Sequence, residues 1–289
     1  MTSFDTWPFP VATAADVATL EAAADVVHTP CGDGRMTWHT WGDGPAVVLL
    51  HGGAGSWTHW VRTIGPLVAA GRRVLAADMP GFGDSAEPPD GHDADVLPRW
   101  IAEGLARLAP REPFDLVGFS FGGLVSGLLA AGGTCPVRRL VLVGAPALSA
   151  ETMPPLPLRV WERLPPGERR DAVHRHNLGV LMLSRPDAID DLAVSLHAAN
   201  IVRDRMRRRR LMRTDLLLRT LPHIGCTVQG IWGEEDALYR GRLDVVRHAL
   251  AQAPRAGAPV FIEGAGHWVQ YERPEAFNQA LARALDAPA

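Results

Sequence analysis

The chain carries the pentapeptide GFSFG at residues 118–122, directly behind the apolar run FDLV at residues 114–117. The helix-like stretch GLVSGLLA follows at residues 123–130. Glycine allows a sharp turn without Cβ clashes. This pattern therefore predicts a nucleophile elbow, a strained strand-to-helix corner that presents the hydroxyl of Ser120 clear of the backbone. The first N–H groups of the following helix have no partner within that helix and would stabilise an oxyanion formed at the same place.

Three other segments place chemically useful residues just beyond apolar runs of strand length. The run AVVLL at residues 46–50 ends in HGGAG at 51–55, a loop with so little side chain that its backbone N–H groups can converge on a neighbouring site. Nearer the C-terminus, VQGIWG at 228–233 leads to EED at 234–236, and VFIEGAG at 260–266 leads to His267. The chain order is therefore serine, acid, histidine, which differs from the orders in chymotrypsin and subtilisin.

These motifs together resemble the α/β-hydrolase fold superfamily, and the resemblance extends from about Val26 to the end of the chain. The stretch GAGHWVQYERPEAFN at residues 264–278 is similar to one branch of it. That branch holds esterases and the hydrolases that cleave carbon–carbon bonds of meta-ring-fission products. The resemblance implies an α/β-hydrolase fold, with a mostly parallel central sheet, helices on both faces and an inserted helical lid.

The alternation of predicted strands and helices agrees with a mostly parallel sheet covered on both faces. Strands are expected at residues 46–50, 73–78, 114–118 and 139–144, after an antiparallel hairpin formed by 26–29 and 36–41. The alternation stops after residue 145 and resumes at 227. Helical segments are expected between these points at 156–164, 168–183, 187–203 and 204–219. The predicted organisation is a core (1–147), a helical lid (148–221) and the rest of the core (222–289).

The triad implied by these positions consists of Ser120, His267 and Asp236. A serine hydroxyl is a weak nucleophile at neutral pH, so it needs a base within hydrogen-bond reach, and His267 is the candidate. Asp236 would orient the imidazole and stabilise the imidazolium. Glu234 and Glu235 are rivals for that role, although the Gly-x-x-Asp spacing favours Asp236.

The oxyanion hole is expected from the backbone N–H groups of Gly53 and of Phe121, the residue after the nucleophile. His51 is expected to anchor the loop that carries Gly53. The side chains predicted to line a substrate pocket are Trp57, Phe119, His197 and Trp268. Core packing would explain the positions of Trp57 and Trp268 equally well.

Composition narrows the choice of partners. All 29 basic residues are arginine, and the net charge is −3. A nucleic-acid-binding protein typically carries a positive charge, so this balance argues against that class. The very basic stretch 203–213 is predicted to be a solvated lid helix, with at most one arginine turned toward an anionic substrate group. The three cysteines lack metal-ligand spacing, so free thiols in a reducing compartment are expected.

No long apolar run and no signal-peptide pattern is present, so we expect a cytoplasmic protein that binds neither a membrane nor a nucleic acid. Its partner would be a small-molecule substrate, with no metal and no cofactor. The sequence leaves the oligomeric state open, and a homo-oligomer is compatible with it.

The function predicted first is a serine hydrolase that cleaves a small, largely apolar carboxylic ester or lactone through an acyl-enzyme. The alternative is hydrolysis of a carbon–carbon bond in a vinylogous diketone, favoured by the Gly-Gly pair at 52–53 and by Trp268. Against it, Phe119 and Phe121 stand where that branch commonly has Asn and Met, and no lid arginine is clearly placed to hold an acidic substrate. A third possibility, from another class, is a non-catalytic small-molecule binder on the same fold.

Overall fold

The computed structural model describes residues 11–109, 112–151 and 155–287, and it contains one eight-stranded sheet. The strand order is β1-β2-β4-β3-β5-β6-β7-β8. The β1–β2 and β2–β4 pairs are antiparallel, and the other pairs are parallel. The strands are β1 (Asp25–Cys31), β2 (Gly34–Trp41), β3 (Ala46–Leu50), β4 (Arg73–Asp78), β5 (Phe114–Phe119), β6 (Val137–Val143), β7 (Thr227–Gly233) and β8 (Val260–Ile262). This arrangement confirms the predicted fold class.

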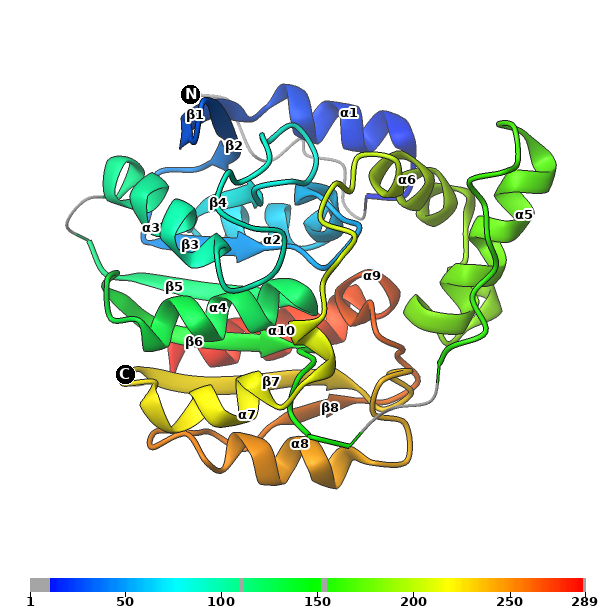
Figure 1. Cartoon of the computed structure of the whole chain (residues 1–289). Coiled ribbons are helices and arrows are strands. Elements are labelled where there is room, and N and C mark those ends of the chain that lie inside the picture. Colours follow the sequence, from blue (N-terminus) through cyan, green and yellow to red (C-terminus); the bar gives the residue numbers. More distant parts are fainter. Residues whose placement is uncertain (1–10, 110–111, 152–154, 288–289) are drawn as a thin grey trace.

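Helices cover both faces of the sheet (Figure 1). One face packs against α3 (Leu97–Leu108), α4 (Phe121–Ala131), α7 (Leu216–Thr220) and α8 (Leu243–Leu250). The other packs against α1 (Ala14–Ala22), α2 (Ile64–Ala69), α9 (Val269–Glu272) and α10 (Pro274–Asp286).

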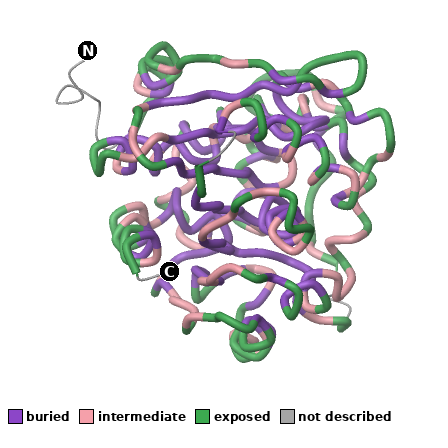
Figure 2. The backbone as a smooth tube through the Cα atoms, turned by 90° about the vertical axis from the view of Figure 1, so that its left-hand side faces the viewer, coloured by how far each residue is buried: buried purple, intermediate pink, exposed green. Residues whose placement is uncertain are grey.

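Strand β3 shows why the sheet needs both layers of helices. All five of its residues are buried, and alternate residues enter opposite cores: Val48 and Leu50 on one face, Val47 and Leu49 on the other. Because successive side chains of a strand point to opposite faces, a continuous apolar run is typical of a strand buried on both sides. Figure 2 shows the buried backbone running through the middle of the molecule, with exposed segments around it.

The segment predicted to form the lid, residues 148–221, is called the insert below. It lies between β6 and β7 and contributes no strand to the sheet in its described part. Figure 1 shows α5 and α6 on the side toward which the parallel strands point. The insert contains α5 (Glu168–Asn177), the π-helical turn η3 (Leu178–Met182), η4 (Pro186–Ala188), α6 (Asp191–Ile201), η5 (Leu211–Arg213), α7 and the start of η6 (Leu221–His223).

Of the four helices expected in the insert, the one at 156–164 is wrong, and the one at 204–219 is right only in its later part, where η5 and α7 form. Residues 156–164 form no helix, and the prolines at 155, 157, 165 and 166 supply the reason, because proline lacks the N–H that a helix needs. Residues 204–210 also form no helix. They run as an irregular strap, which tertiary contacts hold in place of helical hydrogen bonds: Arg205 N–H donates to the Gly81 carbonyl at 2.9 Å, and Met206 is fully buried.

The cysteines are all free, with Cys31 buried and Cys135 and Cys226 half-buried. Among the described residues, no helix is both long enough and apolar enough to cross a membrane.

Candidate active site

The elbow places strain on the serine itself. Ser120 has φ +50° and ψ −119°, a conformation that costs a non-glycine residue about 1–3 kcal/mol. The flanking glycines serve close packing. A Cβ on Gly118 would lie 2.3 Å from Ser126 Oγ, and a Cβ on Gly122 would lie 2.4 Å from the His51 carbonyl oxygen. Side chains at 118 and 122 would therefore push β5, α4 and the loop after β3 apart.

The structure brings the three predicted triad residues together. Ser120 Oγ lies 2.8 Å from His267 Nε2, and His267 Nδ1 lies 2.9 Å from each carboxylate oxygen of Asp236. Asp236 is fully buried, His267 is 2% exposed and Ser120 is 7% exposed. With Nδ1–H donating to Asp236, Nε2 is left to accept the serine proton. The arrangement can therefore carry out nucleophilic acyl chemistry.

The two rival acids lie elsewhere. Glu234 and Glu235 are exposed, and the carboxylate of Glu235 forms an ion pair with Arg240 at 2.9 Å. Asp236 sits in the tight turn after β7, where the Leu238 N–H donates to its Oδ1 at 2.9 Å. A difference of one or two positions in this turn separates a solvated carboxylate from one that faces the histidine.

The loop after β3 is anchored by His51. Its Nε2 accepts the Met79 N–H at 3.0 Å, and its Nδ1 donates to the Gly52 carbonyl at 2.7 Å. Burial lowers the pKa of His51 to about 4, so the ring stays neutral with both nitrogens engaged. The N–H groups of Gly53 and Phe121 have no acceptor among the described residues. Phe121 is the first residue of α4, whose early N–H groups have no intrahelical partner.

Of the four predicted pocket residues, Phe119 and Trp268 lie beside the triad. The Phe119 ring is 5.1 Å from that of His267, and Trp268 directly follows His267 and packs 5.0 Å from His59. His197 lies in α6, and its proximity helps to lower the pKa of His59. The Nε2 atom of His197 is buried without a partner among the described residues.

Trp57 is the exception among the predicted pocket residues. Its ring packs against His39 and Trp41, with centroid distances of 4.9 and 5.6 Å. No described contact brings this ring to Ser120. Its pocket role therefore has no supporting contact, and the core-packing alternative describes the observed environment.

Arg209, on the strap, is a site residue that the sequence did not single out. A Cβ on Gly53 would lie 3.1 Å from its Nη2 and 3.2 Å from its Nε, and its guanidinium carbon is 5.4 Å from the centres of both the Phe82 and Phe121 rings. Its Nη1 is held 2.8 Å from both carboxylate oxygens of Asp204. Nε and Nη2 have no acceptor among the described residues. The basic run was the only signal in the sequence, and it does not say which arginine turns inward.

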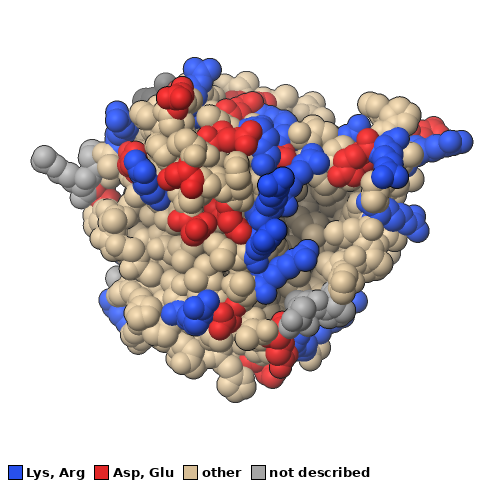
Figure 3. All heavy atoms as spheres, viewed as in Figure 1, with Lys and Arg blue, Asp and Glu red and all other residues tan. Residues whose placement is uncertain are grey.

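Other arginines of the strap stay outside. Arg205, Arg207 and Arg208 border a surface hollow of about 520 Å³. Figure 3 shows basic side chains gathered in a stripe across this face of the molecule. The rim of the insert is therefore positively charged although the chain as a whole is slightly acidic.

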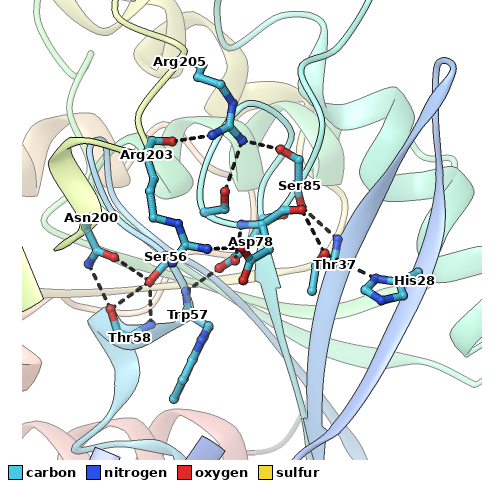
Figure 4. A network of polar contacts seen from close by, with 12 residues as sticks. His28, Thr37, Ser56, Trp57, Thr58, Asp78, Ser85, Asn200, Arg203 and Arg205 are labelled. Carbon is cyan, nitrogen blue, oxygen red and sulfur yellow. Dashed lines mark hydrogen bonds and ion pairs between the residues drawn. The ribbon is translucent and has the colours of Figure 1, made fainter. Parts of the chain in front are cut away.

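A polar network ties the end of α6 and the strap to the loops after β3 and β4 (Figure 4). Ser56 Oγ donates to Asn200 Oδ1 at 2.8 Å, and Asn200 Nδ2 donates to Thr58 Oγ1 at 2.9 Å. Arg203 pairs with Asp84, and Arg205 donates to the carbonyl oxygen of Gly83 at 3.2 Å. At the centre, Asp78 accepts the N–H groups of Trp57 and Asp84, each at 2.9 Å, and burial raises its pKa to about 6.

Glu272, another residue that the motifs did not single out, joins the insert to the histidine loop. Its carboxylate accepts the N–H groups of Gly266 at 2.6 Å and Arg185 at 2.7 Å, together with the Ser184 hydroxyl at 3.0 Å. Trp268 N–H also donates to the Met182 carbonyl at 2.7 Å. The insert therefore contacts the catalytic loops at two separate places.

Neither a metal centre nor the surface hollow beside α8 competes with this site. Among the described residues, no three His, Cys, Asp or Glu side chains are grouped so that they could hold a metal ion. A hollow of about 670 Å³ lies between the insert and α8 and contains none of the predicted site residues. The triad itself is covered, so its geometry defines the site better than an open cavity does.

The chain belongs to the alpha/beta hydrolase family, whose family model matches residues 47–280. A 2-hydroxy-6-oxo-6-phenylhexa-2,4-dienoate hydrolase from Burkholderia cepacia is 30% identical over 254 residues, which cover 82% of this chain and 86% of that relative. The family membership confirms the predicted fold and the hydrolase class.

Solved structures show the same fold with different named activities. A meta-cleavage product hydrolase from Pseudomonas fluorescens IP01 matches with a TM-score of 0.72 at 23% identity, covering 90% of this chain and 97% of that one. An esterase from Exiguobacterium antarcticum matches with a TM-score of 0.74 at 20% identity, covering 90% and 99%. Backbone similarity therefore does not separate ester from carbon–carbon cleavage.

Proposed function

We propose that the protein hydrolyses a carbon–carbon bond next to a carbonyl group in acidic, vinylogous diketones of the meta-ring-fission type. The position of Arg209 carries this proposal, because it sets a cation against the loop that bears Gly53. The Burkholderia cepacia relative is named for a substrate of this class. This reverses the order that the sequence favoured, in which ester hydrolysis came first and no lid arginine was placed near the site.

Each group then has a role in the chemistry. His267 Nε2 takes the proton of Ser120 Oγ as the oxygen adds to the substrate carbonyl, and the oxyanion is held by the N–H groups of Gly53 and Phe121. The carbon–carbon bond breaks, its electron pair spreads into the vinylogous ketone, and His267 returns the proton to the leaving carbon. Water deprotonated by His267 then releases the acid from Ser120, while Asp236 keeps the imidazole oriented throughout.

Arg209 would hold the acidic end of the substrate. Its Nη1 is occupied by Asp204, but Nε and Nη2 form the side of the fork that faces Gly53. A guanidinium fork matches a carboxylate or enolate in geometry as well as in charge. The exposed arginines of the strap would also raise the local concentration of anionic substrate, an effect that weakens with added salt.

The test compares coloured ring-fission dienoates with neutral p-nitrophenyl esters. We expect a higher kcat/KM for the dienoates. Arg209→Gln should raise KM for the dienoates by about ten- to a hundredfold, the range for a lost hydrogen bond to a charged group, and should leave the ester nearly unchanged. Arg209→Lys keeps a charge beside the buried Asp204 but loses the fork. The exposed Arg208→Gln is the matched control.

The outcomes separate the candidates. Equal losses on both substrates would make Arg209 a structural residue and remove the support for an acidic substrate. Preference for esters in the wild type would favour ester hydrolysis, the second candidate, for which the same triad geometry suffices. Binding without turnover of either class would leave a non-catalytic binder.

The insert, residues 148–221, would act as a lid. Its residues Leu178, Met182 and Leu192 share one apolar cluster with Phe119 and Trp268, so they close over the site from the insert side. Ser120 is only 7% exposed, and movement of the insert would let substrate enter and product leave.

A further inference from the structure

The loop after β3 folds around the side chain of His59. Gly52 N–H donates to His59 Nδ1 at 3.2 Å. A Cβ on Gly55 would lie 2.3 Å from Cε1 and 2.4 Å from Nδ1 of the same ring. The imidazole therefore fills the inside of the loop, and residue 55 has no room for a side chain.

His59 also contacts two of the three segments that carry triad residues, those of Ser120 and His267. Its ring packs 5.4 Å from Phe119, the residue before the nucleophile, and 5.0 Å from Trp268, the residue after His267. Trp268 Nε1 donates to the His59 carbonyl at 3.0 Å. The residue is only 4% exposed, so neither contact is a loose surface encounter. The ring is thus fixed from three sides.

The ring must be neutral for the loop contact to exist, because Nδ1 accepts a hydrogen bond. Burial lowers the pKa of His59 well below its ordinary value, and nearby His51, His197 and His267 act in the same direction. The proton of the neutral ring then resides on Nε2, and Nδ1 stays available as an acceptor.

We propose that His59 is a positioning residue for the oxyanion loop: its Nδ1 holds the Gly52 N–H so that the next N–H, of Gly53, is directed at the oxyanion formed on Ser120. The inference rests on the proposed function for the role of Gly53. Peptide planes along this tight loop are linked, so a shift at Gly52 moves the Gly53 donor. Removing one oxyanion donor typically lowers turnover by about 10²–10³.

Two substitutions by amide residues test the Nδ1 acceptor of His59 separately from the bulk of its ring. His59→Asn puts an amide oxygen close to the place of Nδ1, whereas His59→Gln puts its amide near Nε2 and leaves the Gly52 N–H unpaired. His59→Leu removes both polar positions. For each variant, the rate of Ser120 labelling by a small fluorophosphonate, kcat and KM on the best substrate, and the melting temperature are measured.

We expect Gln and Leu to lower both the labelling rate and kcat by about a hundredfold with KM within a few-fold, and Asn to recover at least about tenfold of that loss. Gln and Leu variants with nearly wild-type rates would overturn the proposal. Equal losses in all three variants that follow the melting temperature would also overturn it, because the ring would then matter only as packing. Labelling does not depend on the natural substrate, so failure of the dienoate assignment leaves this test intact.

Discussion

The core loops and the insert surround the same site, but different kinds of interaction hold them in place. In the core, Ser120, Asp236 and His267 each follow a buried strand, and the backbone of the sheet brings the strand ends together. In the insert, short helices and an irregular strap are held by side chains that reach the core, such as Asn200 and Arg205.

This difference explains which predictions succeeded. A residue just beyond a parallel strand is placed by hydrogen bonds between backbones, which any suitable sequence makes. A residue on the strap is placed by particular partners far away in the chain. We therefore expect the chemistry to depend on the core loops and the choice of substrate to depend on the insert.

The largest expected effect is at the elbow. Ser120→Ala should lower turnover by about 10⁶-fold, because no other group supplies the nucleophile. The melting temperature should change little, since the hydroxyl makes no core contact beyond the triad. Turnover is measured on the best substrate and labelling is measured with a fluorophosphonate. Residual activity near the wild-type level, or labelling at a different serine, would show that the core loops do not hold the nucleophile.

The acid after β7 should give the next largest effect. Asp236→Asn should lower turnover by as much as about 10⁴-fold, because the amide favours the wrong imidazole tautomer. Glu235→Gln is the matched control, since that carboxylate is exposed and paired with Arg240, and it should change kcat by less than about twofold. The reverse result would move the acid by one residue and contradict the observed contact with His267.

Substitutions in the insert should change preference without abolishing reactivity. Leu192→Ala should shift the ratio of kcat/KM between small and bulky acyl groups by about tenfold, the range for hydrophobic pocket contacts. The exposed Val202→Ala serves as the control. Labelling of Ser120 by a small phosphonate should be retained. A folded Leu192 variant that no longer labels would show that the insert contributes catalytic groups, and the division between the two regions would fail.

The smallest expected effect is the pH dependence of stability, to which buried groups in both regions contribute. Burial lowers the pKa of His51 in the core and of His197 in the insert to about 4. Between pH 6.5 and 4, the unfolded chain takes up protons that these folded rings refuse, so stability falls as pH falls. Asp78, with its pKa raised to about 6, opposes this trend because it is protonated first in the folded state.

With buried histidines outnumbering that aspartate, the melting temperature should drop by several degrees from pH 7 to pH 5. Calorimetry at the two pH values measures this drop. His197→Gln should reduce it while leaving the contribution of His51. A melting temperature that stays constant or rises on acidification would mean that the buried rings are protonated in the folded state.

The order of serine, acid and histidine beyond apolar strands was enough to predict the fold and the three residues, Ser120, Asp236 and His267, that the structure brings into hydrogen-bond contact. Those features depend on local pattern and on backbone pairing, which the sequence displays directly. The inward turn of Arg209, the clamp of Glu272 and the wrapping of the loop around His59 came only from the tertiary structure. The contacts of Glu272 and Arg209 join residues that are distant in the chain. Arg209 differs from the neighbouring arginines only in the direction of its side chain, and no local pattern encodes that direction in an irregular segment. The helix expected over the strap was mispredicted for the same reason, since tertiary hydrogen bonds replaced local ones there. The helix expected at 156–164 failed because of prolines, which the sequence does display.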